Sequence, residues 1–342
     1  MGRALISGLL ASGFTSNQLS VVEANAVTAL KLHEDFGVQG IGALEQIAFD
    51  FSKNNVVVMA IKPQDFHMVA KGLASKLKHA TAPGPLILSI AAGIRLQDMS
   101  RWLDHARCVR AMPNTPALIG KGITGLFADA AVNADDRQLA ETICSAVGQS
   151  IWVSEEKLMD AVTAVSGSGP AYVFAFLEAM QSAGEKLGLD AATARKLAYA
   201  TLEGATQLAH NSDEHAGTLR ERVTSKGGTT AAALDVMKQQ GWHEILEKAI
   251  DAVGVLPAGA QQLGRENEMR KEIDLLANQI YADTQTPVMN PKEAQATANV
   301  NAMNGTNSTT KGSIDVNFKN APEGTTATSN NKSVMPIIKT SF

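Results

Sequence analysis

The sequence has few of the features that mark a secreted, membrane-bound or nucleic-acid-binding protein. Its 342 residues include two cysteines, Cys108 and Cys144, which excludes a disulfide framework and leaves no ligand spacing for a metal. Lys and Arg number 30 against 34 Asp and Glu, so nothing in the charge favours nucleic acid. No apolar run approaches the roughly 20 residues of a membrane span, and the first residues are too short in apolar length for a secretory signal. We therefore expect a metal-free, soluble, cytoplasmic protein that binds neither nucleic acid nor membrane.

The first part of the chain alternates short β-rich runs with helical patterns. This alternation predicts βαβ units and an α/β Rossmann-type, doubly wound parallel sheet in a domain over 1–154. The apolar run 56–61 is typical of a strand covered on both faces. The expected strands are 19–22, 56–61, 86–90, 108–112 and 151–153, and the expected helices are 26–35, 65–77 and 96–103.

The second part of the chain shows one helical pattern after another, which predicts an all-α domain over 155–265. Alanine and glycine are frequent there and permit close helix packing, so we expect a dimer, with a monomeric bundle as the alternative. Over 266–342 a short helix at 266–282 precedes a segment rich in Asn, Thr, Ser and Lys, which we expect to be disordered. The expected helices of the second domain are 171–187, 191–209, 216–224, 231–240 and one from Trp242 onward.

Three of the expected strands end in small or proline-containing corners. These are Lys62-Pro63-Gln64, Ala91-Ala92-Gly93 and Met112 to Pro116. Ligands of doubly wound sheets bind at the carboxyl ends of the strands, so the three corners together favour a flat cofactor. Each corner alone is explained equally well by Gly and Pro ending a strand.

The chain lacks a strand and a glycine-rich turn ahead of its first helix, 4–11. Only Gly2 remains where a Gly-x-Gly-x-x-Gly turn would hold the pyrophosphate, as if translation had been assigned from an internal methionine. We therefore expect weakened cofactor affinity and poor stability. Glu23 follows the strand 19–22, where an acid bonds the ribose 2′-hydroxyl and favours NAD; an ordinary surface glutamate is the alternative.

The segment Val223–Met237 contains two glycines and then two threonines and three alanines that lead into a helix. Uncovered amides at a helix start bind a carboxylate or phosphate, although an ordinary capped helix start fits as well. The segment Ser166–Tyr172 superficially matches a hydrolase nucleophile elbow, but the residues before Ser166 predict a helix instead of the required strand. The seven histidines show no partner spacing and are expected to be solvated.

Taken in order, these motifs resemble the pyrroline-5-carboxylate reductase family. The resemblance rests on Ala60–Pro63, Ala91–Gly93, Ala111–Pro116, Ser166–Tyr172 and Val223–Met237, and it covers roughly residues 1–250. It implies a Rossmann-type domain followed by a helical dimerisation domain, in a homodimer or an assembly of dimers. It also implies reduction of 1-pyrroline-5-carboxylate to L-proline, the last step of proline biosynthesis, by NADPH, with NADH as the second choice.

The resemblance also implies roles for individual residues. Gly2, Ala60, Ile61, Lys62, Pro63, Ala91 and Ala92 would line the cofactor, and Met112, Asn114 and Thr115 would lie where cofactor and substrate meet. Gly228, Thr229 and Thr230 would hold the substrate carboxylate on backbone amides. The Thr230 hydroxyl would orient the imine nitrogen, which makes Thr230 the expected catalytic residue, and Asp213 would lie near the substrate.

Two other functions stay open at this point. A fragment that cannot bind cofactor would keep only the helical association module, and a cofactor titration separates it from an active reductase. A dehydrogenase of hydroxy acids would need a base beside its substrate, for which Lys226 is the candidate. The family's last helix is also interrupted by Gly254-Val255-Leu256-Pro257, and proline inside a helix costs about 3 kcal/mol.

Overall fold

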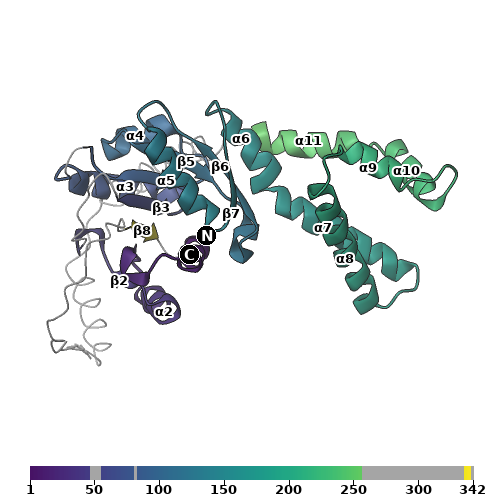
Figure 1. The fold of residues 1–342 in the computed structure, drawn as a ribbon, viewed down its shortest axis with the longest axis horizontal. Coiled ribbons are helices and arrows are strands. Elements are labelled where there is room, and N and C mark those ends of the chain that lie inside the picture. Colours follow the sequence, from purple (N-terminus) through teal and green to yellow (C-terminus); the bar gives the residue numbers. More distant parts are fainter. Residues whose placement is uncertain (47–54, 81–82, 256–334, 340–342) are drawn as a thin grey trace, which may run out of the picture. The chain divides into compact units, whose positions relative to one another are not determined.

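The computed structural model describes residues 1–46, 55–80, 83–255 and 335–339. A sheet with helices on both faces comes first, and a series of helices follows it in the sequence (Figure 1). The predicted helix at 266–282 and the interruption at Leu256-Pro257 lie outside the described residues. The boundaries predicted for the three domains stay predictions.

Eight strands form one sheet in the order β2-β1-β8-β3-β4-β5-β6-β7. All neighbours from β2 to β5 are parallel, which confirms the predicted Rossmann-type sheet. The sequence did not indicate β2 or β6, because β2 is short and largely exposed and β6 contains two glycines. The strands are β1 (Leu19–Val22), β2 (Gln39–Ile41), β3 (Val56–Ala60), β4 (Leu86–Ser89), β5 (Cys108–Met112), β6 (Gly122–Phe127), β7 (Gly148–Trp152) and β8 (Met335–Lys339).

The strands β6 and β7 run against the rest of the sheet. β6 pairs with β5 antiparallel and with β7 parallel, so the expectation of a wholly parallel sheet is wrong here. The connection from β5 to β6 contains only the short 3₁₀ helix η3 (Thr115–Ile119). A parallel crossover needs about a dozen residues or more, so this connection permits only an antiparallel return.

Strand β8 comes from the C-terminal segment and lies in the middle of the sheet, between β1 and β3 (Figure 1). Ile337 is level with Val21 on one side and with Val58 on the other. The expected absence of a strand at this position, and of ordered structure in the tail, is therefore wrong for Met335–Lys339. Pro336 obscured the strand because it lacks an amide donor; it lies opposite Ser20, and pairing with β3 begins only at Ile337.

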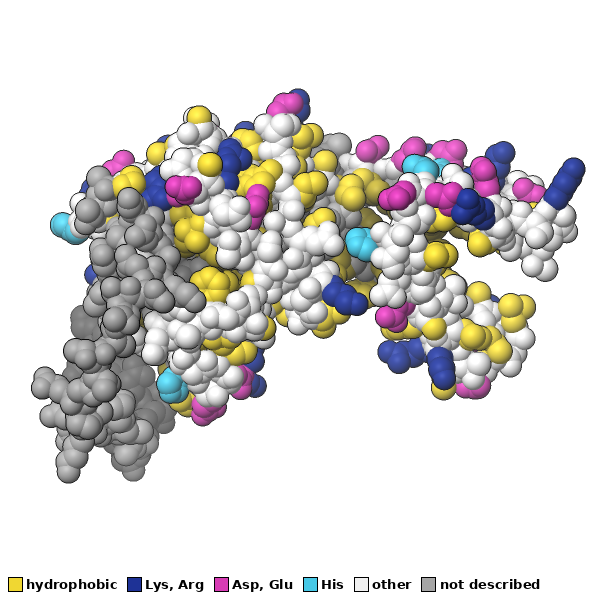
Figure 2. All heavy atoms as spheres, in the orientation of Figure 1, with side chains coloured by type: hydrophobic (Ala, Val, Ile, Leu, Met, Phe, Trp, Pro, Cys, Tyr) yellow, Lys and Arg dark blue, Asp and Glu magenta, His cyan; other side chains and the backbone are white. Residues whose placement is uncertain are grey.

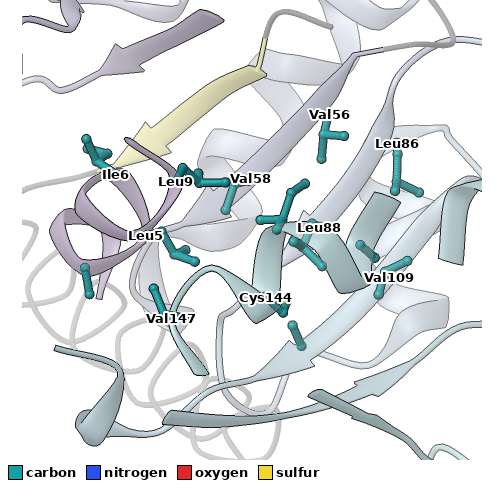
Figure 3. Close-up of a cluster of buried hydrophobic side chains, with 14 of the residues drawn as sticks. Leu5, Ile6, Leu9, Val56, Val58, Leu86, Leu88, Val109, Cys144 and Val147 are labelled. Carbon is teal, nitrogen blue, oxygen red and sulfur yellow. The ribbon is translucent and has the colours of Figure 1, made fainter. Parts of the chain in front are cut away.

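Helices cover both faces of the sheet, as a doubly wound fold requires. Alternate residues of one strand serve the two faces: Val56 and Val58 pack with α1 and α5, whereas Val57 and Met59 pack with α3 and α4. Figure 3 shows Leu5 and Leu9 of α1 beside Val58 on the first of these faces. The helices are α1 (Gly2–Ala11), α2 (Ala26–Phe36), α3 (Pro63–Leu77), α4 (Leu96–Leu103) and α5 (Ala134–Ser145).

The helices predicted for the second part of the chain are all present in the described residues. Few of their side chains are buried: Leu177 in α7, Ala194 and Ala198 in α8, and none in α9 or α10. No described helix is long and apolar enough to cross a membrane. The elements are α6 (Leu158–Val162), the π-helix η4 (Thr163–Gly167), α7 (Gly169–Lys186), α8 (Ala191–His210), α9 (Ala216–Arg222), α10 (Thr229–Gln239) and α11 (Trp242–Val255).

Candidate active site

Three neighbouring parallel strands bring the predicted cofactor corners to one edge of the sheet. β3, β4 and β5 lie side by side and end at Ala60, Ser89 and Met112. The carboxyl ends of parallel strands meet at the same edge, which is where doubly wound sheets bind their ligands. The residues at 60–63, 91–92 and 112–115 therefore gather there, and their contact with a cofactor stays a prediction.

Local features restrain the first two corners. Pro63 is the first residue of α3, where its fixed φ angle suits a helix start. The amide of Ala91 donates to Ser89 Oγ at 3.2 Å, and Ala91 is buried. Corners of this kind let a flat ring approach the edge of the sheet closely.

Met112, at the end of β5, contacts the π-helix η4. A Cβ atom at Gly167 would lie 2.6 Å from Met112 Cε, so only glycine allows this approach without displacing the methionine. A similar approach joins Gly125 of β6 to α6, since a Cβ there would lie 2.6 Å from Val162 Cγ1. The turn of Ser166–Gly169 thus packs against the predicted meeting point of cofactor and substrate.

Two side chains hold η4 in place. Tyr172 Oη donates to the Ala164 carbonyl at 3.1 Å, and Asn114 Nδ2 donates to the Ser166 carbonyl at 3.2 Å. A π-helix interrupts the regular hydrogen-bond pattern of an α-helix, so hydrogen bonds from side chains outside it stabilise it. Such helices are frequent at functional sites. The sequence did not single out Tyr172, although a tyrosine shortly after a Ser-Gly-Ser-Gly run is a visible signal.

Asn114 has a structural role beside the predicted binding role. Its Oδ1 accepts from the Ile123 amide at 2.9 Å, while its Nδ2 donates to Ser166. Both ends of the amide are thus engaged in joining β5, β6 and η4. Any contact with cofactor or substrate would use the remaining N–H or the second lone pair of Oδ1, so we treat Asn114 first as a positioning residue.

The predicted binding site for the substrate carboxylate, which we call the anion seat, is the N-terminus of α10. Gly228 is the cap residue and provides no side-chain cap, and Gly227 before it has a φ of +73°. Within the described residues, the amides of Thr229, Thr230 and Ala231 donate no hydrogen bond, and both threonines are exposed. Three open amides at the positive end of a helix of 11 residues suit a carboxylate.

The two halves of the predicted site lie on different elements of the described chain. α10 packs mainly against α11, and no hydrogen bond among the described residues links Thr230 to Met112 or Asn114. Asp213 is exposed and makes no hydrogen bond or ion pair in the described part of the chain. In the described residues, the anion seat and the strand-end corners are thus separate predicted sites.

Glu23 differs from the surface glutamate that was the alternative to a ribose ligand. It is completely buried directly after β1, and its Oε1 accepts from the Asn25 amide at 3.0 Å. Its Oε2 is buried and has no hydrogen-bond partner among the residues that the structure describes. Gly2 is also buried, at the start of α1. The surface alternative for Glu23 is wrong.

The sequence did not indicate the ion pair between Arg110 and Glu156. Arg110 of β5 is buried and pairs with Glu156 Oε1, which also accepts from the Leu96 amide at 2.6 Å. Glu156 thereby ties the start of α4, which follows the Ala91–Gly93 corner, to β5. An arginine inside the otherwise apolar strand Cys108–Met112 was the signal for a buried partner.

Comparisons with known proteins agree with this arrangement. The family described as pyrroline-5-carboxylate reductase dimerisation matches residues 156–254, and the family described as NADP oxidoreductase, coenzyme F420-dependent, matches residues 1–93. The pyrroline-5-carboxylate reductase of Pseudomonas aeruginosa is 42% identical over 78% of this chain and 95% of its own length.

Solved structures give the same result. The pyrroline-5-carboxylate reductase of Coxiella burnetii has a TM-score of 0.69 and 37% identity, with 76% of this chain and 94% of that one covered. The Plasmodium falciparum enzyme, solved with NADP bound, has a TM-score of 0.63 and 25% identity over 73% of this chain and 90% of that one. The chain therefore belongs to the pyrroline-5-carboxylate reductase family.

Proposed function

We propose that this chain reduces 1-pyrroline-5-carboxylate to L-proline with a hydride from NADPH or NADH. One observation carries the proposal: Met112, at the edge shared by the three corners, contacts the π-helix of the adjoining helical segment. The contact supports the proposal because it joins the corner at Met112 to η4, which lies within the residues that match the dimerisation family. The family membership supports the reaction and the nicotinamide cofactor.

The residues of this chain fit such a cofactor. Pro63 starts a helix and the Ala91 amide donates to Ser89 Oγ, so these two corners offer a restrained surface against which a nicotinamide ring could lie. Glu23 Oε2, at the end of β1, is a buried acceptor that receives no hydrogen bond from the described residues, so a hydroxyl group of the cofactor could donate to it. The bound cofactor would supply the hydride. The corner residues Ala60–Pro63 and Ala91–Ala92 would orient its ring and exclude water from one face.

The anion seat would fix the substrate. The Gly228 amide already donates to the Ser225 carbonyl at 3.0 Å, so the expectation that it holds the carboxylate is wrong. The carboxylate would accept from the open amides of Thr229, Thr230 and Ala231, and the Thr230 hydroxyl would bond the ring nitrogen. An imine is readily protonated, and an iminium ion accepts hydride without a strong acid from the enzyme. The contribution of the protein is then mainly to hold two flat reactants in near-attack geometry, which is worth several kcal/mol.

We infer that a second copy of the chain completes the site. The helices that precede the anion seat expose large apolar side chains, among them Phe174 at 63% and Leu208 at 61%. Figure 2 shows hydrophobic side chains at the surface over α7 and α8. Exposed apolar side chains of this size mark an association surface. A homodimer that buries them would supply the partner for Met112 and Asn114.

We further propose that the enzyme acts in the cytoplasm. Cys108 and Cys144 are both free and buried, and burial raises the pKa of each thiol to about 12. Two protonated thiols without a disulfide suit a reducing compartment.

The test is a substrate panel with a matched pair of variants. The purified chain is expected to oxidise NADH or NADPH with 1-pyrroline-5-carboxylate and not with small hydroxy acids. Thr230→Val should lower kcat by about tenfold or more, because one transition-state hydrogen bond is lost, whereas Thr230→Ser keeps the hydroxyl and should stay near the wild type. Turnover of hydroxy acids instead would favour the dehydrogenase hypothesis, and equal kcat values in the two variants would remove Thr230 from the reaction.

A further inference from the structure

Glu23 is the one buried side chain that the described hydrogen bonds leave half-satisfied. Its backbone amide donates to the Ile41 carbonyl at 2.9 Å, and its Oε1 accepts from the Asn25 amide. Its second oxygen is enclosed and accepts nothing from the described residues. Leaving a buried carboxylate oxygen without a donor is costly, so this oxygen calls for a ligand that brings a hydroxyl or an N–H group.

The position of Glu23 indicates which ligand that is. The residue directly follows β1, whose carboxyl end lies at the same edge as those of β3 and β4. In the strand order 3-2-1-4-5 of doubly wound folds, β1 has the place of strand 2, because β8 lies between it and β3. An acid at the end of strand 2 bonds the ribose 2′-hydroxyl of NAD, whereas an arginine nearby accommodates the 2′-phosphate of NADP. Gly2, the first residue of α1, lies about twenty residues before Glu23, and this is the usual spacing between the last glycine of the phosphate turn and the ribose-binding acid.

The surrounding charges oppose a 2′-phosphate. From Glu23 to Leu30 the sequence contains no Lys or Arg, and the next cation, Lys31, is an exposed residue of α2. Arg3, at the start of α1, pairs with Asp35 at 2.5 Å and is thereby partly neutralised. A phosphate beside Glu23 would therefore meet a buried negative charge with little compensation.

We propose that Glu23 sets the cofactor choice of this chain. Its free oxygen accepts from the 2′-hydroxyl of the adenosine ribose, and its charge repels a 2′-phosphate. NADH then binds more tightly than NADPH, which still binds through the rest of the shared site. The inference rests on the proposed function only in so far as a nicotinamide dinucleotide is the cofactor.

The experiment is an isothermal titration of the full chain with NADH and with NADPH, without imine. The wild type is expected to bind NADH about tenfold more tightly, since one charge-assisted hydrogen bond and one repulsion distinguish the two. Glu23→Gln should shrink this ratio to about twofold or reverse it. The matched control is Glu34→Gln, which removes the same charge from an exposed position on α2 and should leave the ratio unchanged.

A second measurement needs no variant. The wild type should bind ADP-ribose more tightly than its 2′-phosphate, in the same ratio as the two dinucleotides. Wild-type binding of NADPH as tight as that of NADH, or an unchanged ratio in Glu23→Gln, overturns the proposal. A chain that shows the predicted NADH preference but does not reduce the imine refutes only the proposed function; a chain that binds neither nucleotide refutes both.

Discussion

Replacing Ile337 with proline tests whether the C-terminal strand β8 supports the cofactor-binding sheet. Four residues of β8 pair with β1 and three with β3, and Ile337 is paired on both sides. Proline at this position removes an amide donor between two flanking strands, unlike Pro336, which lies opposite β1 alone. The matched control is Ile337→Val, which keeps a β-branched apolar residue with its amide.

The expected magnitude follows from the two flanking strands. Hydrogen bonds contribute about 0.5–1.5 kcal/mol each, which roughly offsets the 1–2 kcal/mol per residue that ordering β8 costs. The remaining loss of stability comes from the backbone groups of β1 and β3 that are left unpaired beside buried residues such as Val21 and Val58, which are 0% exposed. Each such group costs at least about 1 kcal/mol, so two on each of the two strands give a loss of at least roughly 4 kcal/mol.

Thermal unfolding followed by circular dichroism, together with NADH titration, measures this effect. A loss of about 4 kcal/mol lowers Tm by roughly 8–16 °C in a domain of this size. The proline variant should also bind NADH more weakly, because β8 lies between β1, which Glu23 follows, and β3, which ends at Ala60. If the proline and valine variants melt within about 2 °C of each other and bind NADH equally, β8 does not support the sheet.

Three further predictions concern the site and its scaffold. Tyr172→Phe removes the donor to η4 and should lower kcat more than it changes the KM for the imine; an unchanged kcat would contradict the positioning role. Asp136→Asn breaks a buried pair with Arg107, so the free energy of unfolding measured in urea should fall by about 3–5 kcal/mol, and a loss under about 1 kcal/mol would be inconsistent with burial. Burial, with the nearby Arg107 charge, lowers the pKa of His105 below 6.5, although its bond to the Pro85 carbonyl opposes this. The unfolded chain then binds the proton more readily, so stability should fall as the pH drops below about 6.5; His105→Gln should flatten that part of the urea-unfolding profile, and an equally steep profile would refute it.

Local sequence was sufficient for the elements with strong periodicity. The apolar run at Val56–Ala60 predicts a doubly covered strand, and burial on both faces confirms it. Strand β8 could not be predicted, because its place depends on pairing with β1 at the other end of the chain and because Pro336 weakens the local strand pattern. The antiparallel β6 was missed because its glycines hide the strand pattern.

The candidate site was predictable where its chemistry is local. The bare helix start at Gly228 and the corners after β3 to β5 depend on short stretches, and the structure has each of them. The engagement of Asn114 with Ser166, and the burial of Glu23, depend on tertiary contacts that no local pattern encodes. Sequence therefore suggested the residues, and the fold decided what their polar atoms are free to do.

The most direct test of the account is hydride transfer itself. The full chain is incubated with 1-pyrroline-5-carboxylate and NADH that carries two deuterium atoms at C4 of the nicotinamide, and the product is analysed by mass spectrometry and NMR. The account predicts L-proline that carries one deuterium on Cδ, the former imine carbon, in an amount equal to the NADH consumed. Consumption of NADH without labelled proline, or tight NADH binding without any turnover of the imine, would contradict it.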